Sequence, residues 1–285
     1  MAEHAAPTAR TTAHAVTRVV GVDGAEIAYR DLGDGSDTPL VALIHLGATL
    51  DAWDPEVVDP LAVDRRVILL GYRGVGRSTG RARDSFDDMA DDAIAAIHAL
   101  GLTRVDLLGL SMGGMVAQEI IERAPGLVRR VVLAGTAPRG GSGLRRMSGV
   151  LMRGAVRGAL TRRPATSVLF FTRSSVGRGA AAAYQARLKR PRVDREGAVS
   201  PGAIRAQLRA VARRGAQPAP TSALRVERAL AFHGDADVLV PVANARALPA
   251  VFPDIEIVII PDAGHGVVSQ IPDTLTDRTR AFLRG

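Results

Sequence analysis

Short apolar runs alternate with amphipathic segments along most of this chain. The runs at 40–44 and 67–70 are apolar throughout, which is typical of strands buried on both faces of a sheet. Apolar runs of similar length predict further strands at 105–110, 128–134, 230–232 and 255–260. Such runs at regular intervals indicate one sheet with many strands.

The segments between these runs have the spacing of helices. Residues 85–100 place Ala90, Ile94, Ile97 and Leu100 on one side of a helix. Other helices are predicted from Met112 onward, at 241–248, at 271–283 and, interrupted by prolines, within 52–63. The alternation of strands and helices predicts an α/β fold, in which helices cover both faces of a mostly parallel, twisted sheet.

The N-terminal part departs from this alternation. Segments 15–20 and 25–29 flank Asp23-Gly24, a pair that favours a two-residue turn, and so predict a hairpin. A loop rich in Gly, Asp and Ser is expected at 33–39. Residues 1–17 are predicted to form a flexible tail.

A second departure is an insertion at 138–224. Residues 144–160 form an amphipathic pattern, with Met147, Val150 and Leu151 opposite several arginines. Ser200 and Pro201 are typical of a helix start, and Ile204, Leu208 and Val211 would face inward. We predict that 138–224 is a helical cap, inserted between two parts of a core domain formed by residues 18–137 and 225–285.

The charge of the chain is divided in the same way. Residues 138–228 contain 20 Arg and Lys and 3 Asp and Glu, a balance of +17, whereas the remainder contains 17 and 26, a balance of −9; the sum is the net charge of +8. A basic segment can attract anionic substrates, membranes or nucleic acid, or can be a solvated surface. Aromatic residues are sparse in it, so we expect no nucleic acid partner.

Several classes of protein are disfavoured by composition. The chain has no cysteine, which excludes disulfides and thiolate catalysis. No stretch approaches the ~20 apolar residues of a membrane span, and the N-terminus lacks the apolar region of a secretory signal. We therefore expect a cytoplasmic protein without stable membrane insertion; its oligomeric state is open.

One motif carries candidate chemistry. Gly109-Leu110-Ser111-Met112-Gly113 has the G-x-S-x-G spacing of a nucleophile elbow, and it lies between a predicted strand and a predicted helix. A serine in so tight a turn has its hydroxyl exposed, and glycines two residues away avoid collisions. Ser111 is the candidate nucleophile.

A serine nucleophile needs a base and an acid that orients the base. Of the two histidines after Ser111, His265 lies in a glycine-flanked loop, whereas His233 ends an apolar strand and is expected to be structural. Asp237 is the preferred acid, ahead of Asp235 and Asp262. Backbone N–H groups of Met112 and of the loop at 45–48 are expected to form an oxyanion hole.

Together these motifs resemble the capped α/β-hydrolases, in particular the branch of cofactor-free haloperoxidases and enol-lactonases. The resemblance covers about 18–137 and 225–285 and also includes Y-R-G-V-G-R-S at 72–78 and L-G-A-T-L-D-A-W at 46–53. It implies Ser111, Asp237 and His265 as a catalytic triad, Leu46 and Met112 as oxyanion donors, and no metal or organic cofactor. The chain departs from the family in the residues before the donor, so the donor could instead be Gly47.

The resemblance implies an enzyme that acts on a small-molecule substrate. The first hypothesis is a serine hydrolase of carboxylic esters or lactones. Peracid formation and hydrolysis of a C–C bond would use the same triad and stay open. A hypothesis of another class is a protein that binds a ligand without catalysis and retains the hydrolase fold.

Overall fold

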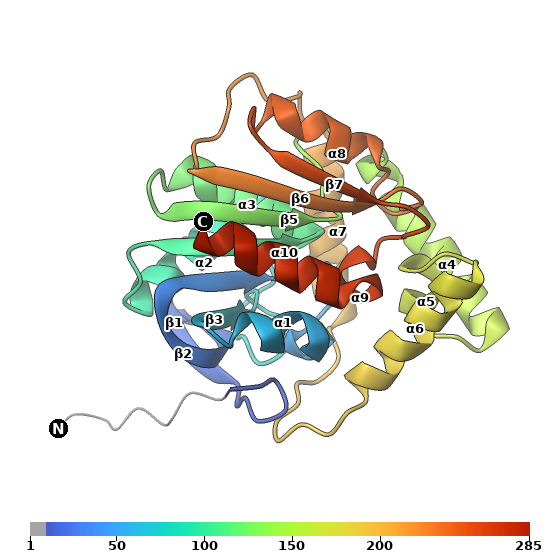
Figure 1. Ribbon diagram of the computed structural model, residues 1–285, viewed down its shortest axis with the longest axis horizontal. Coiled ribbons are helices and arrows are strands. Elements are labelled where there is room, and N and C mark those ends of the chain that lie inside the picture. Colours follow the sequence, from blue (N-terminus) through green and yellow to red (C-terminus); the bar gives the residue numbers. More distant parts are fainter. Residues whose placement is uncertain (1–9) are drawn as a thin grey trace.

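A seven-stranded sheet runs through the computed structural model, which describes residues 10–285 (Figure 1). The order of the strands along the main path is β1-β2-β4-β5-β6-β7, and β3 pairs with β2. The pairings from β4 to β7 are parallel, and β1 pairs antiparallel with β2. The strands are β1 (Arg18–Val22), β2 (Ala25–Leu43), β3 (Arg65–Leu70), β4 (Val105–Leu110), β5 (Val128–Ala134), β6 (Arg228–Gly234) and β7 (Glu256–Ile260).

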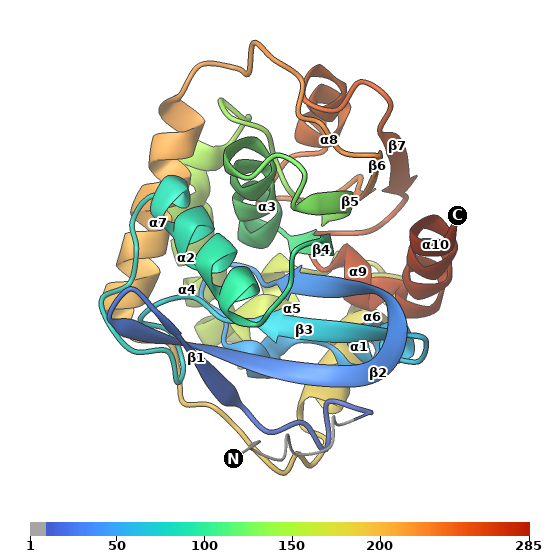
Figure 2. The ribbon, with the colours of Figure 1, turned by 90° about the vertical axis from the view of Figure 1, so that its left-hand side faces the viewer.

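The strand β2 bends sharply, so that its two arms lie on either side of β3 (Figure 2). Val67 of β3 lies opposite both Leu32 and Leu40. The prediction of a loop at 33–39 is therefore wrong. These residues belong to the strand β2, which turns at several register shifts against β3. Gly33 permits this bend: its φ is 71°, and a Cβ there would lie 2.3 Å from the Arg65 carbonyl oxygen.

Helices cover both faces of the sheet, as the alternating pattern predicted. Figure 2 shows α2, α3 and α8 on one face and α1, α9 and α10 on the other. Among residues 10–285, no helix has the length and the apolar character needed to cross a membrane. The core helices are α1 (Pro55–Leu61), α2 (Phe86–Ala99), α3 (Met112–Arg123), α8 (Ala243–Ala247), α9 (Val267–Gln270) and α10 (Pro272–Arg284), with short 3-10 turns η1 (Leu50–Ala52) and η3 (Leu248–Ala250).

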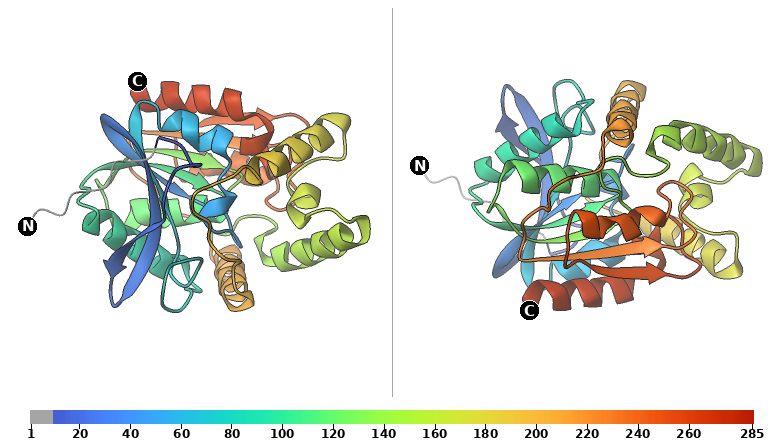
Figure 3. Two further views of the ribbon diagram at one scale, coloured as in Figure 1. Left: turned by 90° about the horizontal axis from the view of Figure 1, so that it is seen from below. Right: turned by 90° about the horizontal axis from the view of Figure 1, so that it is seen from above.

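Four helices occupy the predicted cap, between β5 and β6. Of these, α4, α5 and α6 project beyond the carboxyl ends of the parallel strands, on the side away from the N-terminus, whereas α7 lies beside the core (Figure 3). The serine of the Ser200-Pro201 pair caps α7, since the Ala203 N–H donates to Ser200 Oγ at 3.1 Å. The cap elements are η2 (Leu144–Arg146), α4 (Met147–Thr161), α5 (Ala165–Leu169), α6 (Ser175–Leu188) and α7 (Pro201–Ala216).

The predicted flexible tail is only partly within the described residues, since residues 1–9 lie outside them. From residue 10 onward the segment packs on the core: Thr12 and Ala15 are buried. The Thr12 N–H donates to Asp59 Oδ1 at 2.8 Å, and the Thr17 N–H donates to Asp194 Oδ2 at 2.8 Å. The packed part of the chain thus begins before β1.

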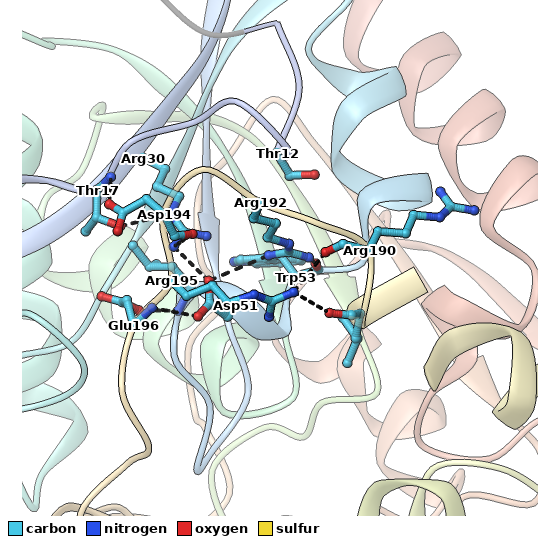
Figure 4. A network of polar contacts seen from close by, with 12 residues as sticks. Thr12, Thr17, Arg30, Asp51, Trp53, Arg190, Arg192, Asp194, Arg195 and Glu196 are labelled. Carbon is cyan, nitrogen blue, oxygen red and sulfur yellow. Dashed lines mark hydrogen bonds and ion pairs between the residues drawn. The ribbon is translucent and has the colours of Figure 1, made fainter. Parts of the chain in front are cut away.

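A polar network connects the segment between α6 and α7 to the core (Figure 4). Asp51 lies at its centre: one carboxylate oxygen accepts from Arg30 Nη2 at 2.7 Å and the other from the Glu196 N–H at 2.7 Å. Arg192 Nη2 donates to the Trp53 carbonyl oxygen at 3.0 Å. The network fixes this end of the cap on the first part of the core.

A buried ion pair holds α6 to the start of α1. Arg187 donates from Nε and Nη2 to both oxygens of Asp54, at distances from 2.7 to 3.1 Å, and the two side chains are 7% and 2% exposed. Arg187 Nη2 also donates to the Ser269 carbonyl oxygen at 2.8 Å. This double hydrogen bond has the geometry that stabilises buried pairs of arginine and carboxylate.

We predict that Arg187→Ala lowers the free energy of unfolding by about 3–5 kcal/mol, because the substitution leaves the Asp54 carboxylate buried and unpaired. Urea denaturation followed by circular dichroism measures the change. Arg190→Ala is the matched control, since Arg190 pairs with Glu56 at 2.8 Å on the surface and should cost no more than about 1 kcal/mol. Equal effects of the two substitutions would contradict the role of the buried pair.

Candidate active site

Ser111 lies in a strained turn between β4 and α3. Its φ of 56° and ψ of −113° are unusual for a residue with a side chain. The turn is held from both sides: the Ser111 N–H donates to the Ala134 carbonyl oxygen at 2.7 Å, and Thr136 Oγ1 donates to the Ser111 carbonyl oxygen at 2.7 Å. The backbone of the turn is thereby fixed to β5 and the loop after it.

The glycines of the motif are required by close approach. A Cβ on Gly109 would lie 2.5 Å from the Gly114 Cα, and a Cβ on Gly113 would lie 2.0 Å from the Leu43 carbonyl oxygen. The start of α3 therefore touches both its own strand and β2. The predicted reason for the G-x-S-x-G spacing agrees with this packing.

The three side chains predicted as a triad form a continuous chain of hydrogen bonds. His265 Nε2 lies 2.8 Å from Ser111 Oγ, and His265 Nδ1 lies 2.7 Å from Asp237 Oδ2. A carboxylate only accepts, so Nδ1 carries the proton and Nε2 presents its lone pair to the serine hydroxyl. All three side chains are buried.

Asp237 is rigidly held in its loop. Its Oδ1 accepts from the Leu239 N–H at 2.8 Å and from the Val240 N–H at 2.9 Å, which leaves Oδ2 for the imidazole. His233 supports the same loop, because its Nε2 donates to the Val240 carbonyl oxygen at 2.8 Å. Burial lowers the pKa of His233, so it lies there as a neutral structural residue.

The other candidate acids lie elsewhere. Asp235 is exposed at the end of β6, and Asp262 Oδ2 accepts from Ser174 Oγ at 2.5 Å. Asp237 is the only carboxylate within hydrogen-bond distance of the His265 ring among the described residues.

The loop after β2 adjoins the serine. The Gly47 N–H donates to Gln207 Oε1 of α7 at 2.8 Å, so this N–H already has a partner. That contact disfavours Gly47 as an oxyanion donor and leaves Leu46, the predicted residue, as the candidate. Met112 begins α3 directly after Ser111, where a helix start presents free N–H groups.

A small closed cavity of about 10 Å³ adjoins His265, room for about one water molecule. Phe170 closes it from the cap: its ring packs edge-on at 5.3 Å from His265 and at 5.1 Å from His45. Trp53 also lines the cavity, and its buried Nε1 has no hydrogen-bond partner among residues 10–285.

Nothing in the sequence pattern pointed to the cap residues at this cavity. Phe170 and Tyr184 line it, and Gln207 contacts the loop beside it. None of them lies in a motif, because the contacts join helices far apart in the sequence. His45 and Trp53 lie within the segment that resembles the family, so their position beside the site could be expected from that resemblance.

His45 is neutral because it is buried. Burial lowers its pKa to about 4, against the smaller opposing effect of a hydrogen bond to the Leu46 carbonyl oxygen. Nδ1 lies 3.0 Å from that oxygen and therefore donates. Nε2 is left as a buried acceptor without a partner.

A family profile described as alpha/beta hydrolase fold matches residues 39–270 of this chain. The structure is similar to that of an alpha/beta hydrolase fold protein from Chitinophaga pinensis, with a TM-score of 0.88 and 30% identity over 97% of this chain and 99% of that one. It is also similar to the enol-lactonase from Burkholderia xenovorans LB400, with a TM-score of 0.72 and 22% identity over 94% and 100% of the two chains.

A non-heme haloperoxidase of Rhodococcus erythropolis is 38% identical over 125 residues, which are 42% of this chain and 44% of that relative. The chain thus matches less than half the length of this relative. The profile match confirms the resemblance to the α/β-hydrolases drawn from the sequence motifs, and a haloperoxidase and an enol-lactonase are among the similar proteins.

The neutral state of His45 predicts a pH-dependent stability. Its pKa in the folded protein, about 4, lies below the unfolded value of 6.5, so the unfolded state binds the proton first as the pH falls. As the pH falls from 7 to 5, this one group should lower the free energy of unfolding by about 2 kcal/mol.

The variant His45→Gln should lose that contribution. Urea denaturation at pH 7 and pH 5 measures both proteins, and the stability of the wild type should fall by about 2 kcal/mol more than that of the variant. The same change in both proteins would show that His45 is not buried as a neutral ring.

Proposed function

The chain belongs to the α/β-hydrolase family, and from that premise we propose that it is a serine hydrolase that cleaves a carboxylic ester or a lactone of a small organic substrate. The observation that carries the proposal is the chain of hydrogen bonds from Ser111 Oγ through His265 to Asp237, at 2.8 and 2.7 Å. This arrangement supports Ser111 as the nucleophile, His265 as the base and Asp237 as the acid that orients the base.

In the first half-reaction His265 Nε2 takes the proton of Ser111 as Oγ attacks the carbonyl carbon. Asp237 holds the imidazole in the required tautomer and stabilises the imidazolium. The N–H groups of Leu46 and Met112 would donate to the oxyanion. The tetrahedral intermediate then expels the alcohol, which receives its proton from His265.

In the second half-reaction water attacks the acyl-enzyme. His265 removes a proton from the water, and the acid leaves as Ser111 Oγ regains the proton. A lactone follows the same steps, except that its alcohol and acid stay on one molecule. No step requires a group other than these side chains and backbone N–H groups.

The closed cavity indicates how a substrate must enter. Its volume of about 10 Å³ is far below the ~300 Å³ of ordinary ligand pockets. Phe170 packs on His265, so an acyl group can reach Ser111 only after Phe170 and the end of α5 move outward. The cap thus acts as a cover that excludes water from the triad when it is closed.

Peracid formation is the second candidate, and the similarity to a non-heme haloperoxidase favours it. Hydrogen peroxide would replace water in the second half-reaction: its oxygen attacks the acyl carbon, His265 takes its proton, and the peracid leaves as Ser111 is restored. The ratio of peracid to acid, measured with one acetate ester at increasing peroxide concentrations, distinguishes the two reactions.

We predict that Ser111→Ala lowers kcat for a p-nitrophenyl ester by about 10³-fold or more, because the nucleophile is lost. A fluorophosphonate probe should label the wild type at Ser111 and leave the variant unlabelled. Retained esterase activity in the variant would refute the assignment. A folded wild type that is neither labelled nor active would favour the ligand-binding protein without catalysis.

We predict that Asp237→Asn lowers kcat by about 10⁴-fold, since the amide would hold the wrong tautomer of His265. Asp235→Asn is the matched control: the residue is two positions away, is exposed, and should leave kcat within a factor of about two. A larger loss of kcat in the Asp235 variant, with both proteins folded, would contradict the assignment of Asp237 as the acid that orients His265.

A further inference from the structure

A second cavity lies in the cap and is unlike the catalytic one. Its volume is about 450 Å³, and its walls come from α4, α5, α6 and the turns between them. The four cationic residues that line it are Arg157, Arg163, Arg173 and Arg178. We call this cavity the arginine groove; it has no lining residue in common with the catalytic cavity.

The arginine groove contains positive charge without matching negative charge. Residues 139–193 include no Asp or Glu. Other cap arginines pair with core carboxylates, as Arg187 does with Asp54 and Arg139 does with Glu119. None of the four groove arginines makes an ion pair within residues 10–285.

The carboxylate of Asp262, which contacts the segment that forms the groove wall, is already engaged. Asp262 Oδ2 accepts from Ser174 Oγ at 2.5 Å, and the Asp262 carbonyl oxygen accepts from Thr172 Oγ1 at 3.3 Å. Within residues 10–285, the one hydrogen bond of the four guanidinium groups lies within the cluster, from Arg178 Nη1 to the Arg173 carbonyl oxygen at 2.5 Å. The charge of the groove is therefore left to solvent or to a ligand.

Four guanidinium groups around one cavity repel one another, and an anion between them removes that cost. Guanidinium groups match the geometry of phosphate oxygens, to which they donate two parallel hydrogen bonds. The Ser167 hydroxyl on the same wall supplies a further donor, whereas the hydroxyls of Thr161 and Thr172 already donate to backbone carbonyl oxygens. The volume suits a small organic ligand.

We propose that the arginine groove binds the phosphate group of a phosphate-bearing organic ligand. The site is separate from the triad, and the proposal does not depend on ester hydrolysis. Two sources of such a group differ in their surroundings: a ligand free in solution, or a lipid headgroup. The exposed side chains of Met152, Val156 and Leu160, one turn apart on α4, would contact acyl chains only in the second case.

The test compares two double variants with the same loss of charge. Arg157→Gln with Arg173→Gln removes two groove residues, and Arg146→Gln with Arg153→Gln removes two exposed arginines of the cap outside the groove. Neither pair makes an ion pair in the described part of the chain, so both variants should keep the wild-type melting temperature.

The first probe is inorganic pyrophosphate, titrated into each protein by calorimetry. The wild type and the control should bind one equivalent with similar affinity. The groove variant should bind about 10- to 100-fold more weakly, a total of about 1.4–2.7 kcal/mol for the two guanidinium groups that it lacks. Equal weakening in both variants would overturn the proposal, because it would indicate general attraction by the net charge.

The second probe is vesicles of phosphatidylglycerol with phosphatidylcholine, compared with phosphatidylcholine alone in a sedimentation assay. Binding only to the vesicles with phosphatidylglycerol, lost in the groove variant and retained in the control, supports the headgroup as the source. Pyrophosphate binding without vesicle binding supports the free ligand. Binding of neither probe by the wild type overturns the proposal.

Discussion

The strained turn at Ser111 is the constraint on which the rest of the site depends. A positive φ of 56° costs on the order of 1–3 kcal/mol in a residue with a side chain. The surroundings impose it: β5 accepts from the Ser111 N–H, and Gly113 lies against the Leu43 carbonyl oxygen. Because the turn cannot relax, the hydroxyl is held at 2.8 Å from His265, and the start of α3 is held against the end of β2 at Leu43.

The uneven charge of the chain is explained by the way the cap sits on the core. Buried or half-buried acids of the core accept from cap arginines: Asp54 from Arg187, Asp51 from the segment around Arg192, and Glu119 from Arg214. Electrostatic attraction between the positive cap and the negative core therefore adds to the packing that holds the cap in place. The arginines left over lie on α4 and its neighbours, away from the core, which is why a surplus of positive charge collects there.

The sequence was sufficient for the existence of the strands after β3, for the tight turn at Ser111 and for Asp237 as the carboxylate beside His265, because each follows from a local pattern. It failed where the contacts are distant. The interior face of α7 buries Gln207 and Arg214, whereas the predicted Ile204 and Leu208 are only half-buried. Arg214 donates from Nη2 to Gln118 Oε1 at 2.9 Å and from Nη1 to Glu119. No periodicity along α7 encodes partners that lie about a hundred positions earlier. Similarly, α6 is rich in alanine and has too weak an apolar stripe to be predicted.

The distribution of these ion pairs also limits how the catalytic cavity can open. The far end of α6 is fixed by Asp54, and α7 is fixed by Glu119 and, through Arg209 and Arg213, by Asp84. In the described structure α4 and α5 make no ion pair with the core; the carbonyl oxygen of Phe170 accepts from the Gly266 N–H at 2.8 Å. An outward movement of α4 and α5 would therefore break hydrogen bonds and apolar contacts but no buried ion pair. Phe170, at the end of α5, packs on His265, and α4 and α5 also form walls of the arginine groove. Under the proposed function, a ligand bound in the groove would therefore act on the same element that a substrate has to displace.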